Sequence, residues 1–413
     1  MSAKIIDTDA LAAILLELRW ESAEARHIER VHAGKVNFWR DIFPGESVQP
    51  GGLGALLKGR RAGEEVSLRL RPGADMPLPD PARLLDLPLA AMEAQHDLPA
   101  PMPRQGRFYP RGVIARAADT FPQDIRPMRV VGVSPERFLA DTNHPLAGRE
   151  LTVAARVLEV RDKGGEMGGE CSHVLECLAD NGPGMQARWR GMPTDFYADD
   201  PFFRPDQAED SRFYLEPRLV QHVDAMARER LRALHAELLK EGQDVLDLMA
   251  SHESHLPQGL ALGKVAGLGL NAAELAANPA LDERVVRDIN ADPRLPFEER
   301  AFDVVLCSLS VEYLTRPDEV FLEAARVLRP GGLFLCSFSN RWFPAKAVRI
   351  WTELHEFERM GLVLDYFLRA GLFEDPCTLS ERGWPRPWDP ADRYVDRLRA
   401  ADPLLAVWAR RGA

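Results

Sequence analysis

Polar segments follow apolar runs at several points in the second half of the chain. They occupy residues 247–255, 269–271, 288–290, 308–313 and 338–341. Ligands of open parallel sheets bind in the crevice outside the carboxyl ends of the strands, so these segments predict one shared ligand site. In the last segment, Arg341 could clamp a carboxylate or a phosphate, because a guanidinium donates paired hydrogen bonds to such groups.

Two clusters of histidine and cysteine invite a metal interpretation. The run His-Glu-Ser-His at 252–255 lacks the spacing of the helical zinc motif, in which the two histidines lie four residues apart. Cys171, His173 and Cys177 form a sparse set, for which free thiols are the simpler interpretation. The sequence therefore predicts no metal.

Strands and helices that would position the polar segments alternate after residue 240. Apolar runs predict strands at 245–249, 265–268, 284–287, 302–307 and 332–338, with closing strands at 376–379 and 404–409. Helices are predicted at 272–277 and 317–328, and helical spacing over 217–240 predicts a lid. This alternation predicts an α/β Rossmann-type fold, a mostly parallel sheet with helices on both faces.

Three motifs lie at a characteristic spacing in this half. They read Leu-Pro-Phe at 295–297, Phe-Asp-Val-Val-Leu-Cys at 302–307 and Arg-Val-Leu-Arg-Pro-Gly-Gly at 326–332. The second is nearly all apolar, as a strand buried on both faces requires, and the third ends a helix in a tight turn. On these motifs, residues 205–413 resemble class I S-adenosylmethionine (SAM)-dependent methyltransferases of the type 11 branch.

One subgroup of that family is similar to this chain over a longer stretch. The similar segments are Asp-Leu-Met-Ala-Ser-His-Glu-Ser-His-Leu-Pro at 247–257, Gly-Leu-Asn-Ala-Ala-Glu-Leu at 269–275 and Phe-Ser-Asn-Arg at 338–341. The chain departs from the wider family at 247–257, which has no glycine. Glycines there let the backbone approach the ligand.

The resemblance implies SAM as the cofactor and gives the strand-end residues their roles. The cofactor-binding candidates are Asp247, Met249 and Ser251 for the methionine part, Asn271 for the ribose, Asp288 and Ile289 for the adenine, and Ser308. The candidates near the methyl acceptor are Glu312, Tyr313, Asn340 and Arg341. Methyl transfer needs a base only where the acceptor must lose a proton, so no catalytic residue is assigned.

The first half of the chain is predicted to be rich in β-strands. Alternating patterns predict strands at 66–70, 128–133, 137–142 and 151–162. Residues 10–20 fit either a helix or a strand. Residues 72–103 contain many prolines and predict a long loop or insertion rather than regular sheet.

Two strings in this half resemble FKBP-type prolyl isomerases of the SlyD kind. They are 52–64 and 138–162, the second containing Asn-His-Pro-Leu-Ala-Gly. The resemblance implies a β-rich α+β domain over 1–162 with a flap-type insertion at about 72–130. Its candidates for a prolyl-peptide cleft are Trp39, Phe43, Val48 and Phe138.

The isomerase chemistry of that family depends on an apolar cleft that favours the twisted amide. The Ala-Tyr-Gly that follows the strand in the family is replaced here by Arg-Pro-Gly-Ala-Asp at 71–75. We therefore expect weak isomerase activity or none. A retained fold that binds a peptide or docks the second domain fits the sequence equally well.

Composition limits the partners. The net charge is -11 and no segment is strongly basic, which disfavours nucleic acid. No apolar run is long enough to span a bilayer, and five cysteines in 413 residues fit a reducing, cytoplasmic compartment. A small-molecule acceptor is expected, with a peptide or protein held by the FKBP-like domain as the competing expectation.

The predicted organisation is an FKBP-like domain at 1–162, a linker at 163–204 and a methyltransferase domain at 205–413. The predicted function is SAM-dependent methyl transfer. The alternative is a prolyl isomerase or chaperone-like binding protein, whose methyltransferase-like half is structural or acts on a bound protein.

Overall fold

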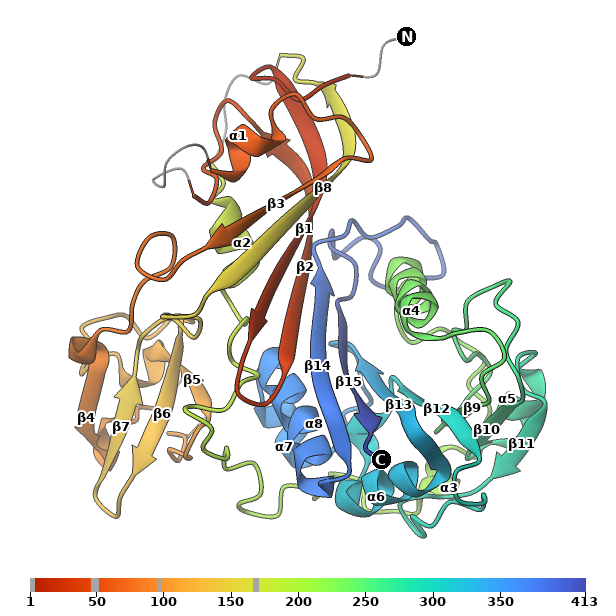
Figure 1. Cartoon of the computed structure of the whole chain (residues 1–413). Helices are drawn as coiled ribbons and strands as arrows, with labels where there is room; N and C mark the ends of the chain where they lie inside the picture. Colours follow the sequence, from red (N-terminus) through yellow and green to blue (C-terminus); the bar gives the residue numbers. More distant parts are fainter. Residues whose placement is uncertain (1–3, 46–51, 95–98, 166–170) are drawn as a thin grey trace. The chain divides into compact units, whose positions relative to one another are not determined.

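The computed structural model describes residues 4–45, 52–94, 99–165 and 171–413 (Figure 1). The chain forms two compact units. Unit 1 consists of Met1–Ala198 and Leu354–Gly361, and unit 2 consists of Asp199–Glu353 and Leu362–Ala413. Unit 1 thus extends past residue 162, the predicted end of the first domain.

The main sheet of unit 1 is antiparallel. Its strands are, in sheet order, β2 (Arg26–Asn37), β1 (Ala10–Glu21), β8 (Leu151–Asp162) and β3 (Glu65–Leu70). Residues 10–20 are therefore in a strand, and not in a helix. Alternate side chains of β1 and β8 enter a core that also includes the short helix α1 (Leu53–Leu57).

Residues 84–141 form a second, smaller antiparallel sheet in unit 1. Its order is β4 (Leu84–Pro88), β7 (Arg137–Asp141), β6 (Pro127–Val133) and β5 (Phe108–Pro110). The short helices η1 (Pro81–Arg83), η2 (Leu89–Ala91) and η3 (Arg111–Ile114) lie between these strands in the sequence. Strand β4 corrects the prediction of a loop over 72–103. Its proline stands at the strand end, where a missing N–H costs little.

The predicted linker at 163–204 is largely folded in its described part. Helix α2 (Val174–Ala179) buries Val174 and Leu178 in the core of the main sheet. This segment was predicted to be a linker because it is rich in Gly, Pro and Asp and has no periodic apolar pattern. Its few apolar residues are nevertheless enough to attach it to unit 1.

Unit 2 contains a mixed sheet. Its strands are, in sheet order, β11 (Glu283–Val286), β10 (Val265–Gly269), β9 (Val245–Leu248), β12 (Phe302–Ser308), β13 (Leu328–Phe338), β15 (Leu404–Arg411) and β14 (Phe373–Arg382). The strands from β11 to β13 are parallel, and the last two are antiparallel. Strand order reverses between β9 and β12, which makes that point a topological switch point.

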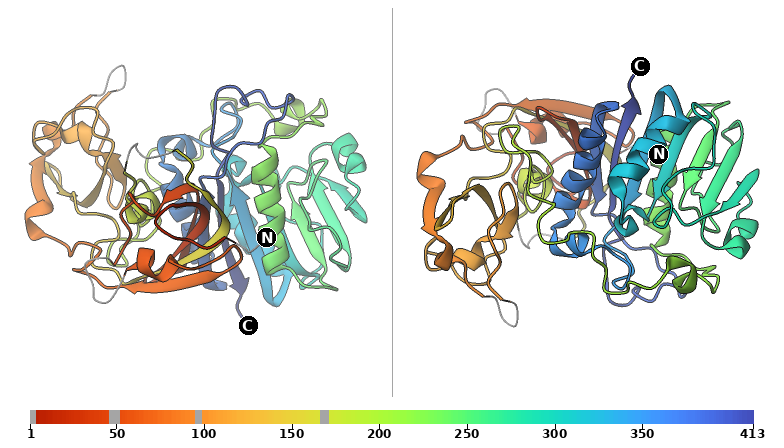
Figure 2. Two further views of the ribbon diagram at one scale, coloured as in Figure 1. Left: turned by 90° about the horizontal axis from the view of Figure 1, so that it is seen from above. Right: turned by 90° about the horizontal axis from the view of Figure 1, so that it is seen from below.

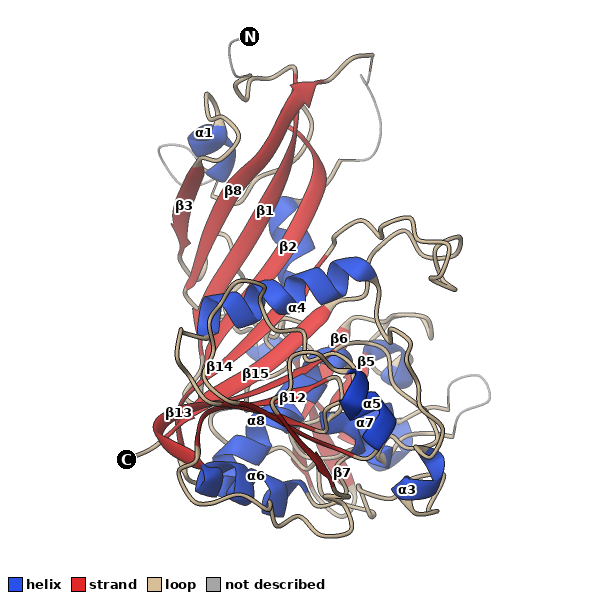
Figure 3. Cartoon of the chain, turned by 90° about the vertical axis from the view of Figure 1, so that its right-hand side faces the viewer, coloured by secondary structure: helices blue, strands red, loops and turns tan. Residues whose placement is uncertain are grey.

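Helices cover both faces of this sheet. Phe321 of α6 (Pro317–Val327) and Phe367 of α8 (Glu356–Ala370) both contact Phe334 of β13, so these helices share a face. Helix α4 (Ala225–Leu238) lies across the opposite face from α8 (Figures 2 and 3). The shorter helices of unit 2 are α3 (Asp210–Phe213), α5 (Ala272–Ala277), η4 (Val311–Tyr313) and α7 (Arg349–Glu353).

The helix predicted over 217–240 is shorter in the structure. Helix α4 begins at Ala225, where the side chain of Asp224 accepts a hydrogen bond from the N–H of Ala227 at 2.9 Å. An aspartate in this position is a strong helix start, and it ends the helical pattern that the apolar spacing suggested. Within the described parts of the chain, no helix is long and apolar enough to cross a bilayer.

Candidate functional site

A cavity of about 560 Å³ lies at the carboxyl ends of the parallel strands of unit 2. Its lining includes all the predicted cofactor-binding residues, namely Asp247, Met249, Ser251, Asn271, Asp288, Ile289 and Ser308. It also includes Tyr313, Asn340 and Arg341 from the predicted acceptor set. The ends of β9, β10, β11, β12 and β13 therefore supply one site.

Glu312 is the exception. It is buried, and it does not line the cavity. Its backbone carbonyl accepts a hydrogen bond from the N–H of Val348 at 3.0 Å, and its side chain interacts with Tyr313. Adjacent residues of the short helix η4 point in different directions, so the sequence could not separate Glu312 from its neighbour.

Asp247 is a carboxyl group of the cavity whose pKa is raised. It is almost fully buried in strand β9, and burial raises its pKa to about 6. A hydrogen bond from Ser254 and the nearby charge of His255 act in the opposite direction but do not cancel this effect. A buried carboxyl with a raised pKa is stabilised by a cationic ligand group, because the cation favours the ionised form.

Two non-glycine residues of the cavity have the left-handed backbone conformation that glycine usually adopts. Met249 has φ of 60° and so takes up the left-handed conformation directly after β9. Leu309 does the same after β12, with φ of 55°. Such conformations cost about 1–3 kcal/mol for a non-glycine residue and cluster at functional sites.

Gly269 lies where two strand ends approach most closely. A Cβ atom at this position would collide with the backbone carbonyl of Ala250 and would also press on Leu275. The bare backbone of β10 is therefore needed to bring the first loop against the second strand. A glycine in β10 therefore permits the close approach of the two backbones, because the first loop itself has no glycine.

Asn271 does not have a free side chain for a ribose. Its Oδ1 caps α5 by accepting hydrogen bonds from the N–H groups of Ala273 and Glu274, at 2.9 and 3.1 Å. Its Nδ2 donates to the carbonyls of Tyr214 and Leu215, at 2.9 and 3.1 Å. The structure thus gives Asn271 a structural role in holding the segment 214–215 over the cavity.

Asp288 keeps one oxygen available. Its Oδ1 accepts hydrogen bonds from the N–H groups of Asn290 and Ala291, at 2.9 and 3.2 Å. Its Oδ2 makes no hydrogen bond with any residue that the structure describes. A carboxylate fixed through one oxygen can accept a hydrogen bond from a ligand amino group through the other.

Arg341 is already paired. Its Nε donates to Asp402 at 2.9 Å, and its guanidinium lies 3.9 Å from the ring centroid of Tyr394. These contacts use Nε and one face of the guanidinium, and the clamping of an anionic acceptor by Arg341 stays a prediction. The partner lies in the segment between β14 and β15, so Arg341 positions Tyr394 at the cavity.

Several lining residues were missed by the sequence interpretation. They are Asp210, Tyr214, Arg218, His222, Phe343 and Tyr394. Most lie in irregular segments with no periodic pattern. An aromatic-rich stretch at 213–222, directly before a capped helix, was the only available signal.

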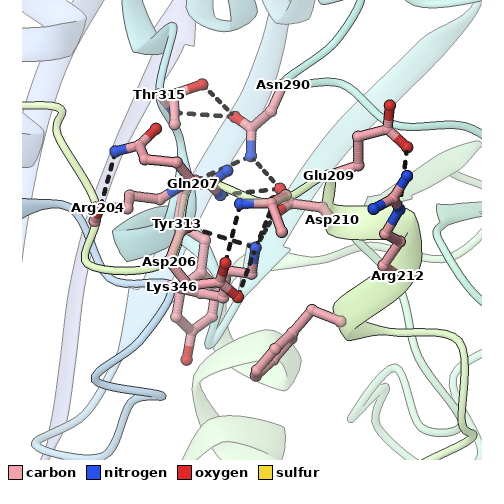
Figure 4. A network of polar contacts seen from close by, with 12 residues as sticks. Arg204, Asp206, Gln207, Glu209, Asp210, Arg212, Asn290, Tyr313, Thr315 and Lys346 are labelled. Carbon is pink, nitrogen blue, oxygen red and sulfur yellow. Dashed lines mark hydrogen bonds and ion pairs between the residues drawn. The ribbon is translucent and has the colours of Figure 1, made fainter.

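A polar network holds the start of unit 2 at the edge of the site (Figure 4). Lys346 is fully buried, and its Nζ lies 3.1 Å from carboxylate oxygens of both Asp206 and Asp210. Asp210 also pairs with Arg204 at 2.9 Å and accepts from Asn290 at 2.9 Å. Burial tends to raise the pKa of Asp210, but these hydrogen bonds outweigh it and the pKa is lowered.

The candidates for a prolyl-peptide cleft are not brought together. Phe43 is buried in the core of the main sheet, whereas Phe138 is buried in the separate core of the smaller sheet. Trp39 is largely exposed and contacts Lys163. Val48 lies outside the described residues. The sequence motif could not reveal this separation, because it does not specify to which core each ring belongs.

The candidate metal ligands have other contacts. The thiol of Cys171 donates to the carbonyl of Arg40 at 3.1 Å, and His173 lies 3.6 Å from Glu176. Among the residues that the structure describes, no three His, Cys, Asp or Glu side chains gather as a metal centre requires.

Comparison with known proteins gives one family match. A family model described as a methyltransferase domain matches residues 253–336, which contain the loop after β9 and the strands β10 to β13 up to Cys336. The ubiquinone/menaquinone biosynthesis C-methyltransferase UbiE of Roseobacter denitrificans is 39% identical over 97 residues, which are 22% of this chain and 37% of that protein. UbiE of Chromobacterium violaceum is 34% identical over 116 residues, 26% of this chain and 47% of that protein.

The chain spans less than half the length of these curated relatives. Among solved structures, a SAM-dependent methyltransferase from Mesorhizobium loti is similar to part of the chain. The match covers 43% of this chain and 96% of that protein, at 19% identity and a TM-score of 0.28. That likeness is too low to support an inference.

Residues 253–336 of unit 2 are similar to a methyltransferase domain. They lie in a mixed sheet that carries the cavity at the ends of its parallel strands. The family match lies within this unit, and the FKBP-type or SlyD-type domain in unit 1 stays a prediction from the sequence.

Proposed function

We propose that the chain transfers a methyl group from SAM and that the cavity of unit 2 binds this cofactor. The observation that carries the proposal is a pair of carboxyl groups, Asp247 and Asp288, at the ends of β9 and β11. They line one cavity, on either side of the bare backbone of Gly269. A cofactor with an ammonium group at one end and an adenine amino group at the other would donate hydrogen bonds to these two acceptors.

The residues fit the cofactor part by part. Asp247 would hold the ammonium group, which would relieve the cost of its burial. Asp288 would accept from the adenine amino group through Oδ2, and buried Ile289 would contact the ring. Because Asn271 is committed to backbone partners, the ribose would meet the edge of the site near Glu274 and Ser251, which are themselves joined by a 2.7 Å hydrogen bond.

When bound, SAM supplies a methyl group on a sulfonium that is already activated. The contribution of the chain is then alignment and exclusion of water, and alignment alone is worth up to about 7–11 kcal/mol of the barrier. Asn271 and Glu274 hold the segment 214–218 over the strand ends through hydrogen bonds to its backbone. Tyr394, held by Arg341, borders the cavity from the segment between β14 and β15.

We propose a small-molecule acceptor. A cavity of about 560 Å³ is within the range of small-molecule sites, and the net charge of -11 would repel a long polyanion. The relatives are named as C-methyltransferases of ubiquinone and menaquinone biosynthesis, but the chain covers less than half of each. The acceptor is therefore argued from the cavity itself.

The proposal does not extend to prolyl isomerisation. The resemblance of unit 1 to that family predicted an apolar cleft, and the separate burial of Phe43 and Phe138 gives no such cleft. A peptide-binding or docking role of unit 1 remains a prediction from the sequence.

The raised pKa of Asp247 provides a test. Its carboxyl is ionised above about pH 6 and protonated below it, and only the ionised form attracts an ammonium group. We expect the affinity for S-adenosylhomocysteine, the demethylated product, to be constant above about pH 6.5 and to fall by up to about tenfold per pH unit below 6. Isothermal titration calorimetry between pH 5 and 8 measures this dependence.

Asp247→Asn is the matched variant, because it keeps the shape and removes the titration. It should bind the product weakly and with no pH dependence in this range. A wild-type affinity that does not change between pH 5 and 7 would contradict the assignment of the ammonium group to Asp247.

A further inference from the structure

The segment 213–223 forms one wall of the cavity in unit 2. Its backbone is held at three points over the ends of β9 and β10. Asn271 donates to the carbonyls of Tyr214 and Leu215, and the N–H of Arg218 donates to Glu274 Oε1 at 2.7 Å. Farther along, the side chain of Gln221 donates to Glu253 at 2.9 Å. The side chains of this segment are therefore fixed against the cavity.

An aromatic surface lies at the β13 end of this wall. Its centre is Phe343, in the loop after β13, and its ring contacts four others edge-on or tilted. The centroid distances to Phe343 are 5.4 Å for His222, 5.7 Å for Phe213, 6.1 Å for Tyr313 and 6.4 Å for Tyr214. The proposed SAM-binding carboxyl groups lie at the ends of β9 and β11, whereas Phe343 follows β13, on the other side of the switch point. The aromatic surface therefore connects the loop after β13 with the segment 213–223 along the cavity.

His222 is the one histidine among the five rings of this surface. It is exposed, it lines the cavity, and its ring packs edge-on against Phe343. Neither ring nitrogen forms a hydrogen bond with any residue described by the structure. By contrast, the neighbouring His252 lies 3.2 Å from the hydroxyl of Ser251. A histidine in a cavity with both nitrogens available can exchange a proton with a bound ligand.

We propose that His222 is the general base for methyl transfer to a planar aromatic acceptor that carries a hydroxyl group and packs on Phe343. The inference deepens the proposed function and depends on it. The aromatic rings, together with the Arg218 guanidinium 5.1 Å from the centroid of Phe343, select a flat aromatic body. Rings pack offset or edge-on against other rings, and they attract a cation over their faces. The open nitrogen of His222 selects a hydroxyl at its edge.

The transferred proton, methyl group and electron pair are all accounted for by His222, the acceptor and SAM. A nitrogen of His222 takes the proton of the acceptor hydroxyl and becomes a cationic imidazolium. The oxygen forms a bond to the methyl carbon of SAM, while the bond from that carbon to sulfur breaks and its electron pair stays on sulfur. The products are a methyl ether and a neutral thioether. The imidazolium then releases its proton to water.

The charges around His222 favour its neutral form. Although part of the ring is open to the cavity, the protein atoms packed around it lower the pKa of His222 below its usual value. Arg218 and the imidazoles of His252 and His255 act in the same direction. Glu274 opposes them, without reversing the result. The imidazole is therefore neutral at pH 7, the state in which it accepts a proton.

The test uses the full chain saturated with S-adenosylhomocysteine, so that no methyl transfer occurs. Two probes of equal shape are compared, 4-nitrophenol with a dissociable proton and 4-nitrotoluene without one. We expect the wild type to bind 4-nitrophenol at least about tenfold more tightly, as expected for a hydrogen bond to a group that becomes charged. His222→Gln should lose this preference while its affinity for 4-nitrotoluene and for S-adenosylhomocysteine stays within about twofold.

A spectroscopic readout accompanies the affinities. In protein labelled with ¹³C-histidine, the ring resonance that is missing in His222→Gln should shift when 4-nitrophenol is added to the wild type and should not shift with 4-nitrotoluene. His173→Gln, which changes a histidine of unit 1, should behave like the wild type.

Two results would overturn the inference alone. One is tight binding of S-adenosylhomocysteine together with a 4-nitrophenol preference that survives in His222→Gln. The other is tight binding of S-adenosylhomocysteine with no binding of 4-nitrophenol. A chain that does not bind S-adenosylhomocysteine at all would instead overturn the proposed function, and the inference with it.

Discussion

Gly269→Val is expected to abolish binding of S-adenosylhomocysteine to the full chain. A Cβ atom at this position meets the backbone carbonyl of Ala250, which cannot move unless the loop after β9 moves as well. That loop begins with Met249 in its left-handed conformation, two residues after Asp247. Since a displacement of about 1 Å at an aligned site can cost on the order of a hundredfold, we expect at least that loss in calorimetric titrations.

Gly165→Ala is the control for this variant. Gly165 does not have the left-handed φ that strains a side chain, and no atom of the residues that the structure describes lies within 4 Å of an added Cβ. It should leave binding unchanged. If Gly269→Val bound S-adenosylhomocysteine within about fivefold of the wild type, the close approach of β10 to the first loop would not be part of the site.

Arg386→Met is expected to produce the largest loss of stability in unit 2. The Arg386 side chain is nearly fully buried and pairs with Asp224 at 3.2 Å, Asp392 at 2.7 Å and Asp402 at 3.1 Å. Burial tends to raise the pKa of Asp402, but hydrogen bonds from Arg386 and Arg341 outweigh it, so this carboxylate stays ionised. Removing the arginine leaves three carboxylates together, at a cost of about 3–5 kcal/mol.

This loss corresponds to a decrease of about 6–20 °C in the melting temperature of a unit of this size. Differential scanning calorimetry measures it. Arg349→Met is the matched control, because Arg349 pairs at 3.0 Å with Glu353 on the exposed surface of α7, where such pairs contribute about 0–1 kcal/mol. Equal melting temperatures for Arg386→Met and the wild type would show that the acidic cluster does not depend on this cation.

The sequence predicted the frame of the site well. The run at 302–307 and the motif at 326–332 defined central parallel strands, and polar residues after apolar runs indicated which end carries the ligand. That logic placed Asp247 and Asp288 at one cavity, because strand ends in a parallel sheet meet at one edge.

What the sequence could not predict depends on partners far along the chain. The side chain of Asn271 donates hydrogen bonds to backbone carbonyls 57 and 56 residues earlier in the chain. The guanidinium of Arg341 donates to a carboxylate 61 residues later. An amide and a guanidinium look equally available in a sequence whether or not such a partner exists. His222 was missed for a related reason, because the apolar spacing placed it in a helix over 217–240, whereas the helix begins only at Ala225.

The N-terminal half shows the same limit. Alternating patterns predicted strands β3, β6, β7 and β8, but the motif that resembles prolyl isomerases did not predict that Phe43 and Phe138 enter different cores. Alternation specifies the faces of a strand, whereas the partner of each face is decided by topology.

Calorimetric titration of S-adenosylhomocysteine into the full chain, in parallel with Asp288→Ala, tests the central claim most directly. The account predicts one site in the wild type. It also predicts an affinity lower by about 10- to 150-fold in the variant, which loses a charge-assisted hydrogen bond worth about 1.5–3 kcal/mol. The absence of binding in the wild type, or equal affinities for the two proteins, would contradict the placement of the cofactor at the strand ends of unit 2.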